Sequence, residues 1–466
     1  MTFLDAIQKY SKKIAIIVNN KKITYEKLIK KSENLVKKIE KRSLVFILGG
    51  NNYETIAYYV GLVRSKSVIV LIDPNLNNLF LINLIKQYKP NYIILPNKKQ
   101  KLSGYNKISN FLNYSALKKQ NNNKINLHKD LAILLTTSGS TGSPKLVRQS
   151  YKNYIDNSKN IIQELKIDSN DSVITTLPIS YTFGLSIINT YLISGSKIIL
   201  NEKSILESDF WKLFNKVSPT SFYGVPFTYE ILLKLKFRNL NNKNLKIFGQ
   251  AGGKLNDDIF KKVVNFSLKN NIKFYSMYGQ TEATARMSIL NHKDAEKKIG
   301  SIGKPLKNGK FFIVNKNKKI VNKPFYKGEL VFEGKNVCYG YSNNYLDLSH
   351  GNLNNFKLFT GDIAFFDKEK FFFIVGRKKR IIKIFGSRIN LDEVENIIDK
   401  LGYKAICKQE DNILSIKVTK NKFNEKYLIN KISELLNLNK SIIKLEKISR
   451  LPRNKMEKKL LNEQYK

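Results

Sequence analysis

The chain has 466 residues, of which 42% are hydrophobic and 26% carry a charge, so two or three domains with buried cores are expected. This composition excludes a disordered protein, and the presence of only two cysteines excludes a disulfide framework. Lysine and arginine outnumber aspartate and glutamate by 82 to 37, which gives a net charge of +45.

The start of the chain does not resemble a targeting segment. Residues 1–18, MTFLDAIQKYSKKIAIIV, contain Asp5 and lack a basic stretch followed by a long apolar run, so we expect no signal peptide. No apolar stretch in the sequence reaches ~18 residues, which predicts no membrane span. With Cys338 and Cys407 as the only cysteines, we expect a reducing, cytoplasmic location.

The N-terminal part alternates short strand-like runs with helical patterns. The strand-like runs are SLVFILG, SVIVLID and YIILP, and the helical ones between them are NYETIAYYVGLV and LFLINLIKQY. The alternation resumes in SVITTLP, SKIIL, SFYGVP, LKIFGQAGG and IKFYSMYG. This pattern predicts an α/β fold with mostly parallel sheets covered by helices, in which the loops after strands bind ligands.

A loop rich in hydroxyl groups follows the strand-like run LAILL. Residues 137–145 read TSGSTGSPK, where glycines allow close approach to an anion, hydroxyls can donate to phosphate oxygens, and Lys145 adds a positive charge. Pro144 before the lysine and Leu146 after it exclude a Walker A loop. Taken alone, a loop of this composition is more often a flexible connector.

The pattern changes near Lys310. KFFIVNKNKKIV, GELVFEG and FTGDIAFFDKEKFFFIVGR are typical of β-hairpins, which predicts a β-rich subdomain over about 310–375. We assign residues 1–375 to a large N-terminal domain. Residues 376–466 contain the helix NLDEVENIIDKLG, the strands YKAICKQ and ILSIKVT, and a helix near YLINKISELLNL, which indicates a small α+β domain.

Several motifs together resemble the adenylate-forming superfamily, the AMP-dependent synthetases and ligases that include acyl-CoA synthetases and adenylation domains of peptide synthetases. TSGSTGSPK is similar to the phosphate loop of that superfamily. The motifs that follow it in the family's order are LPISYTFGL, FYGVP, GQAGGKL, YGQTE, GELVFEG, YGY at residues 339–341, FTGD, GRKKRIIKIFGSRINLDEVE and LPRNKMEKK. TYEKL at residues 24–28 is a weaker match.

The resemblance implies a set of nucleotide-binding residues. Glu282 would hold Mg²⁺, Thr281 would contact the α-phosphate, and Asp362 with Arg377 would bind the ribose. The residues implied for ATP binding as a whole are Thr137, Ser138, Gly139, Ser140, Thr141, Gly142, Lys145, Gly252, Gly253, Tyr278, Gly279, Thr281, Asp362 and Arg377.

The resemblance also implies an acyl pocket and a hinge. The pocket would be lined by Tyr181, Phe183, Gly184 and Tyr223. Lys379 would lie at the pivot on which a mobile C-terminal domain turns, and Gly386 would line a tunnel for a pantetheine arm.

Thr281, Lys145 and Lys458 are the residues implied to act in catalysis. Aligning LPRNKMEKK on its LPR places Lys458 at the position of the catalytic lysine, with Glu457 where the family has glycine. Lys455 and Lys459 are competing candidates, and a solvated lysine-rich tail is the alternative reading.

The implied reaction joins a carboxylic acid to AMP with release of pyrophosphate and then transfers the acyl group to a thiol. A carboxylate is already ionised at neutral pH, so no general base is needed, which agrees with three histidines that lie outside every motif. LPISYTFGLS has no acidic residue to pair with a substrate ammonium group, which favours a fatty, hydroxy or aryl acid. The acceptor would be coenzyme A or the phosphopantetheine of a carrier protein acting in trans.

Two other readings remain open. The chain could be an acyl-AMP ligase that acts only on a carrier protein, or a catalytically weak AMP-binding relative. The charge of +45 also fits a nucleic-acid binder, but the lysines are spread along the whole chain without interleaved aromatic residues. We therefore expect no nucleic acid as the primary partner.

Overall fold

The computed structural model describes residues 3–99, 102–121, 124–136, 145–237, 240, 242–384, 387–410, 413–419, 424–436 and 438–451. Contacts divide the chain into two compact units. Unit 1 comprises residues 1–310 and 333–358, and unit 2 comprises residues 311–332 and 359–466. Most of the β-rich stretch that we assigned to the N-terminal domain thus groups with unit 2. The boundary at residue 375 and the mobility of the C-terminal domain remain predictions.

Nine described strands of unit 1 form one large sheet. Its strand order is β16 (Lys304–Pro305), β15 (Ser288–Leu290), β14 (Lys273–Tyr278), β13 (Ile247–Gln250), β12 (Ser221–Gly224), β10 (Ser172–Ile174), β11 (Lys197–Ile199), β1 (Ile14–Val18) and β2 (Lys21–Thr24). The strands from β14 to β1 pair in parallel, and the outer strands pair antiparallel.

Eight described strands form the second sheet of unit 1. Their order is β19 (Tyr341–Ser342), β9 (Leu146–Ser150), β8 (Leu131–Thr136), β4 (Val68–Ile72), β3 (Leu44–Leu48), β5 (Tyr92–Pro96), β7 (Tyr114–Lys119) and β6 (Tyr105–Phe111). The central pairs are parallel, as the alternation of strands and helices predicts.

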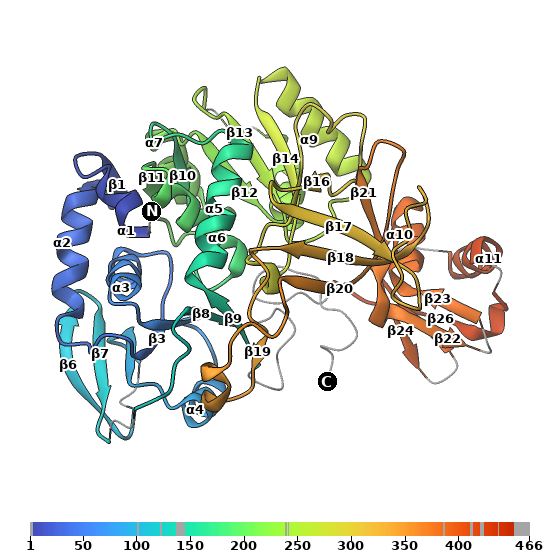
Figure 1. Cartoon of the computed structure of the whole chain (residues 1–466). Helices are drawn as coiled ribbons and strands as arrows, with labels where there is room; N and C mark the ends of the chain where they lie inside the picture. The colour runs from blue at the N-terminus through green and yellow to red at the C-terminus, as the bar shows by residue number, and fades with distance from the viewer. Residues whose placement is uncertain are drawn as a thin grey trace. The chain divides into compact units, whose positions relative to one another are not determined.

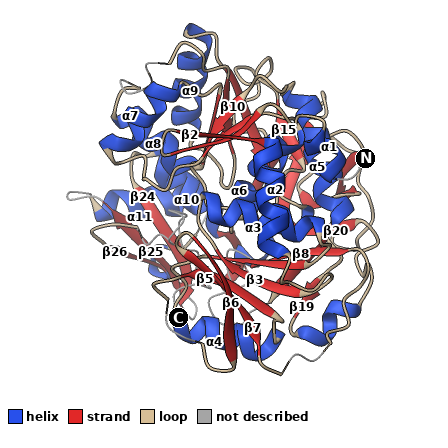
Figure 2. Cartoon of the chain, turned by 90° about the vertical axis from the view of Figure 1, so that its left-hand side faces the viewer, coloured by secondary structure: helices blue, strands red, loops and turns tan. Residues whose placement is uncertain are grey.

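The main hydrophobic core of unit 1 lies between the two sheets. It combines side chains of both sheets with those of α2 (Tyr25–Val36), α3 (Tyr53–Arg64), α5 (Tyr151–Leu165) and α6 (Thr182–Ile193). Figure 2 shows α2, α3 and α6 between the strands of the two sheets. All twelve residues of α6 are buried, including the polar residues Ser186, Asn189 and Thr190.

Alternating side chains of the strands face opposite sides of each sheet. In β3, Val45 and Ile47 enter the central core, while Leu44, Phe46 and Leu48 face a second cluster with α4 (Asn78–Tyr88). In the nine-stranded sheet, Tyr223 belongs to the central core, whereas Phe222 contacts α7 (Ser208–Val217) on the other face.

The outer face of the nine-stranded sheet is covered by α7, α8 (Pro226–Lys234) and α9 (Asp257–Lys269), which contact Phe222, Phe248 and Phe274. Trp211 of α7, the only tryptophan of the chain, is 6% exposed and lies nearly parallel to Phe222 at a centroid distance of 6.5 Å. Its indole nitrogen donates to the carbonyl oxygen of Ile205. Figure 1 shows this part of unit 1 in green.

The starts of α2, α3, α4, α5 and α9 carry side chains that cap the helix. Thr24 accepts from the amide of Lys27 at the start of α2, and Ser150 and Asn153 form a capping box at the start of α5. The remaining short helices of this unit are α1 (Phe3–Gln8), η1 (Thr281–Ala283) and η2 (Tyr345–Ser349).

Unit 2 contains a β-sheet and a small α+β part. The sheet has the order β17 (Gly309–Val314), β18 (Gly328–Gly334), β20 (Lys357–Phe366) and β21 (Phe372–Arg377), and the ends of three of these strands belong to unit 1. The α+β part comprises η3 (Lys378–Arg380), β22 (Ile381–Ile384), β23 (Ser387–Asn390), α10 (Leu391–Lys400), β24 (Lys404–Glu410), β25 (Ile413–Thr419), α11 (Glu425–Leu436), η4 (Lys440–Ile442) and β26 (Ile443–Lys447).

Alkaline pH is expected to destabilise unit 1. Burial raises the pKa of ten tyrosines that are at most 2% exposed: Tyr25, Tyr58, Tyr59, Tyr88, Tyr92, Tyr154, Tyr191, Tyr223, Tyr229 and Tyr275. Above pH ~10 the unfolded chain loses these phenolic protons while the folded chain keeps them. The contribution of these tyrosines to the free energy of unfolding is complete below that pH. As the pH rises further, each tyrosine lowers the free energy of unfolding by about 1.4 kcal/mol per pH unit.

Melting temperatures measured from about pH 8 to about pH 11, together with tyrosinate absorbance, check this expectation. The tyrosines on the surface should titrate gradually, and the absorbance change of the buried tyrosines should coincide with unfolding. Titration of all the tyrosines in a protein that stays folded would contradict it.

Candidate active site

The YGQTE motif forms a tight connection between two strands of unit 1. It follows β14 and leads through η1 into β15, which pairs antiparallel with β14 and sets Tyr278 opposite Ser288. A Cβ atom on Gly279 would lie 1.1 Å from the carbonyl oxygen of Ala285, so this position requires glycine. Thr284 and Ala285 have positive φ angles of 57° and 84°. A rare conformation in a short connection is common at functional sites.

Tyr341 contacts both Glu282 of this connection and Lys145. The hydroxyl of Tyr341 donates to the Glu282 carboxylate at 2.6 Å. The ammonium nitrogen of Lys145 lies 3.9 Å from the centroid of the same ring, within the range of a cation–π contact. The end of the predicted phosphate loop and the predicted metal ligand therefore lie side by side in unit 1.

Strand pairing explains why these residues meet. Lys145 directly precedes β9, and β19 pairs with β9 so that Tyr341 lies opposite Val147. Arg148 stabilises the segment around β19, since its guanidinium donates to the carbonyl oxygens of Tyr339, Tyr341 and His350. Burial, and secondarily the charge of Glu282, raise the pKa of Tyr341, so its hydroxyl stays protonated and can donate.

Thr281 is fixed by two neighbours. The side-chain amide of Gln149 donates to its carbonyl oxygen at 2.9 Å, and the hydroxyl of Thr182 donates to its Oγ1 at 2.9 Å. Because Thr281 accepts at Oγ1, its own hydroxyl proton can be donated to another acceptor. Thr182 belongs to the LPISYTFGL segment, so this contact joins two of the motifs.

The predicted acyl-pocket residues also come together. Phe183 packs edge-on against both Tyr181 and Tyr223, with centroid distances of 6.4 Å and 6.1 Å. A Cβ atom on Gly184 would lie 2.2 Å from the carbonyl oxygen of Pro178, which explains the glycine. Burial raises the pKa of Tyr181 and of Tyr223, so both phenols are neutral.

Arg286 lies against this aromatic wall and was missed by the sequence reading. Its side chain is 1% exposed, and its guanidinium carbon lies 5.3 Å from the Phe183 centroid and 5.2 Å from the Tyr223 centroid. The signal in the sequence was a single basic residue four positions after Glu282, outside the YGQTE motif.

The predicted adenine-binding segment follows a neighbouring strand. β12, β13 and β14 are adjacent and parallel, so the segments after their carboxyl ends share one edge of the sheet. Gly252 has a φ of +85°, and the Gln250 side chain donates to the carbonyl oxygen of Gly253 at 2.8 Å. Gly252 and Gly253 thus leave the sheet at the same edge as Tyr278.

Asp362 and Arg377, the predicted ribose contacts, form a cross-strand pair in unit 2. They are opposite residues of β20 and β21, and Arg377 Nε lies 3.1 Å from Asp362 Oδ1. Asp362 is 3% exposed. The backbone of Lys379 lies in η3.

Several predicted residues lie outside the described residues. They are Thr137, Ser138, Gly139, Ser140, Thr141, Gly142, Gly386 and Lys458, together with the competing candidates Lys455 and Lys459.

The predicted magnesium site rests on a single protein carboxylate. Among the described residues, no group of three or more His, Cys, Asp or Glu side chains could hold a metal ion. One carboxylate fits Mg²⁺, which commonly takes one or two carboxylates and completes its shell with phosphate oxygens and water. Cys338 and Cys407 are buried and unbridged, and no described helix is long and apolar enough to cross a membrane.

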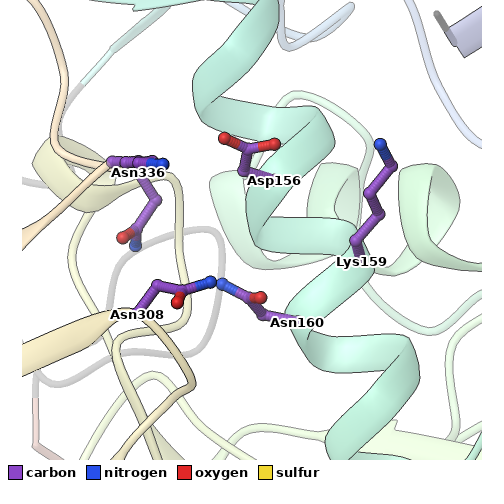
Figure 3. Close-up of a pocket in the computed structure, with 6 residues that line it drawn as sticks. Asp156, Lys159, Asn160, Asn308 and Asn336 are labelled. Atoms are coloured by element: carbon purple, nitrogen blue, oxygen red, sulfur yellow. The ribbon is translucent and has the colours of Figure 1, made fainter. Parts of the chain in front are cut away.

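A polar hollow lies elsewhere in unit 1. It measures about 190 Å³ and is lined by Asp156, Lys159, Asn160, Asn308, Lys335 and Asn336. Figure 3 shows three of these side chains on one helix, α5, with the two asparagines 308 and 336 beside it. None of the predicted site residues lines it, and we assign no role to it.

Comparison with known proteins completes these observations. The family model described as AMP-binding enzyme matches residues 3–342. A 2-succinylbenzoate–CoA ligase of Listeria innocua is 26% identical over 403 residues, which cover 84% of this chain and 81% of that protein. A long-chain-fatty-acid–CoA ligase of Bacillus subtilis is 26% identical over 452 residues, covering 84% and 79% of the two chains.

A solved structure shares the fold. O-succinylbenzoate coenzyme A synthetase from Bacillus subtilis, in complex with ATP and a magnesium ion, has a TM-score of 0.79 and 19% identity, and the match covers 98% of both chains. At this identity the likeness shows the fold alone, and it confirms the predicted α/β class.

Proposed function

This chain belongs to the AMP-binding enzyme family, and on this basis we propose that it activates a carboxylic acid with ATP and passes the acyl group to a thiol. An oxygen of the acid attacks the α-phosphorus of ATP, and the bond to pyrophosphate breaks. The thiol then gives up its proton to water, its sulfur attacks the acyl carbon, and AMP leaves. The observation that carries this proposal is the arrangement of Lys145, Tyr341 and Glu282 around the YGQTE connection.

The reaction brings two negatively charged partners together, so the residues must neutralise charge and hold a line of attack. Mg²⁺, when bound, would neutralise charge on the phosphates. Glu282 would hold this ion, and Tyr341 orients the carboxylate through its hydrogen bond. Lys145 would contact the outer phosphates, and the Thr281 hydroxyl would donate to the α-phosphate.

Other roles rest on the family motifs. The loop from Thr137 to Gly142 would enclose the β- and γ-phosphates, with Gly252, Gly253 and Tyr278 near the adenine. Asp362 would accept hydrogen bonds from the ribose hydroxyls, with Arg377 beside it. Lys458 would bridge the acid and the α-phosphate. Residues 376–466, turning at Lys379, would form the mobile domain.

Two features of the pocket favour an acid without an amino group. No acidic residue occurs in LPISYTFGLS, and the pocket wall carries the buried cation Arg286, which would repel a substrate ammonium group. Both relatives named above are CoA ligases, so we favour coenzyme A as the acceptor over a carrier protein. A cytoplasmic location remains an expectation.

ATP–pyrophosphate exchange with a panel of fatty, hydroxy and aryl acids tests the proposal. We expect exchange with at least one acid, its loss when a chelator removes Mg²⁺, and its return when Mg²⁺ is restored. Supplying coenzyme A or a carrier protein separately then identifies the acceptor. Absence of exchange with every acid in the presence of Mg²⁺ would overturn the proposal.

A further inference from the structure

Arg286 differs from the other buried arginines of the described chain. All three of its guanidinium nitrogens, Nε, Nη1 and Nη2, lack a hydrogen-bond partner of good geometry, although the side chain is 1% exposed. Arg148 is 0% exposed and donates to three carbonyl oxygens. Arg380 is paired with the carboxylates of Asp392 and Glu395. Among the residues that the structure describes, Arg286 is therefore the buried arginine whose guanidinium has neither a carboxylate nor a carbonyl partner.

Such an arrangement is unfavourable in the protein alone. A buried charge is normally paired and hydrogen-bonded, because removing it from water is costly. Burial lowers the pKa of Arg286, with partial compensation from Tyr223, but the guanidinium remains charged near neutral pH. The faces of Phe183 and Tyr223 and the hydroxyl of Tyr223 offset part of the cost, but neither residue supplies a negative charge to pair with the guanidinium.

The backbone fixes Arg286 within the candidate site. The Asn157 side chain donates to its carbonyl oxygen at 2.7 Å, and the amide of the next residue, Met287, donates to the carbonyl oxygen of Tyr278 at 2.8 Å. One short connection thus carries both Glu282, the proposed metal ligand, and Arg286, which lies against the aromatic wall.

We propose that Arg286 binds a second carboxylate of the acid substrate, so that the enzyme selects dicarboxylic acids. A planar guanidinium can donate two parallel hydrogen bonds to one carboxylate. The reacting carboxylate loses its charge when the acyl-adenylate forms, whereas a distal carboxylate keeps its charge through both steps. A lasting partner for a buried cation is therefore the distal group. This inference rests on the proposed function and names the substrate class.

Matched pairs of acids test the inference. Short and medium-length α,ω-dicarboxylic acids and aryl dicarboxylic acids are each compared with the monocarboxylic acid of equal length in ATP–pyrophosphate exchange. For the best pair, we expect kcat/KM to favour the diacid by about 100-fold or more. In Arg286→Met this preference should disappear through loss of activity with the diacid, and Arg286→Lys should retain part of it.

Arg42→Met is the matched control, because the Arg42 guanidinium donates to the carbonyl oxygens of Lys66, His128 and Leu131, away from the aromatic wall. It should lower the melting temperature and leave the diacid preference unchanged. If Arg286→Met does not fold, the preference of the unmodified protein decides, and a ratio near one or below overturns the inference.

Binding without ATP separates this inference from the proposed function. A diacid that raises the melting temperature of the unmodified protein more than its monoacid does, and does not do so in Arg286→Lys or Arg286→Met, supports the inference even if no acid gives exchange. Equal shifts of the melting temperature with diacids and monoacids would overturn the inference. Exchange with monoacids would in that case leave the proposed function intact.

Discussion

Replacing Glu282 with glutamine is expected to lower acid-dependent pyrophosphate exchange by about 1000-fold, since a metal-held phosphate contributes several kcal/mol of charge stabilisation. Glutamine has the size of glutamate, and its carbonyl oxygen can still accept from the Tyr341 hydroxyl. The substitution therefore removes the charge and keeps the hydrogen bond. The melting temperature should stay within about 2 °C of the unmodified protein. Exchange rates at several Mg²⁺ concentrations measure the effect.

Glu40→Gln is the matched control, because Glu40 is an exposed carboxylate that pairs with Lys118 at 2.9 Å. It should leave exchange unchanged. The exchange rate of Tyr341→Phe should lie between the rates of Glu282→Gln and Glu40→Gln. This variant keeps the ring under Lys145 and removes the hydrogen bond to Glu282. Exchange by Glu282→Gln within about tenfold of the unmodified rate would refute the metal-binding role.

The second large effect is expected for Gly279→Ala. The added Cβ would meet the carbonyl oxygen of Ala285 at 1.1 Å, and a backbone atom can move only if the whole connection moves. We expect a loss of about 3 kcal/mol or more in the free energy of unfolding. Displacement of Thr281, Glu282 and Arg286 should reduce exchange by more than about 100-fold. Urea unfolding and exchange assays measure the two effects.

Gly351→Ala provides the comparison. An added Cβ there meets only the His128 side chain, at 3.5 Å, and no positive φ is involved. Its stability should change by less than about 0.5 kcal/mol. Equal behaviour of the two variants would show that the YGQTE connection tolerates a side chain and that the packing argument is wrong.

Much of the fold followed from the sequence because its strands are apolar on both faces. LVFIL became β3 and VIVLI became β4, each fully buried, and DKEK became the turn between β20 and β21. β9 was not predicted. Its residues LVRQS look polar, yet all five are buried, because Arg148 finds three carbonyl oxygens and Ser150 caps α5. Hydrophobicity alone does not reveal such partners.

The candidate site was predictable to the extent that it lies in motifs. Lys145 and Glu282 were both singled out, and they meet in unit 1. Tyr341, which joins them, was seen only as part of the YGY motif, since its role depends on the pairing of β19 with β9. Arg286 escaped notice because an arginine in a lysine-rich chain carries no signal until its burial and lack of partners are known.

The placement of the single tryptophan gives the protein an internal optical reporter. Trp211 lies nearly parallel to Phe222. The next residue along β12, Tyr223, faces the opposite side of the sheet and belongs to the aromatic wall. Indole emission therefore comes from one position, on the face of the sheet opposite to Tyr223. Its wavelength would follow repacking at β12 as an acid binds, without any label.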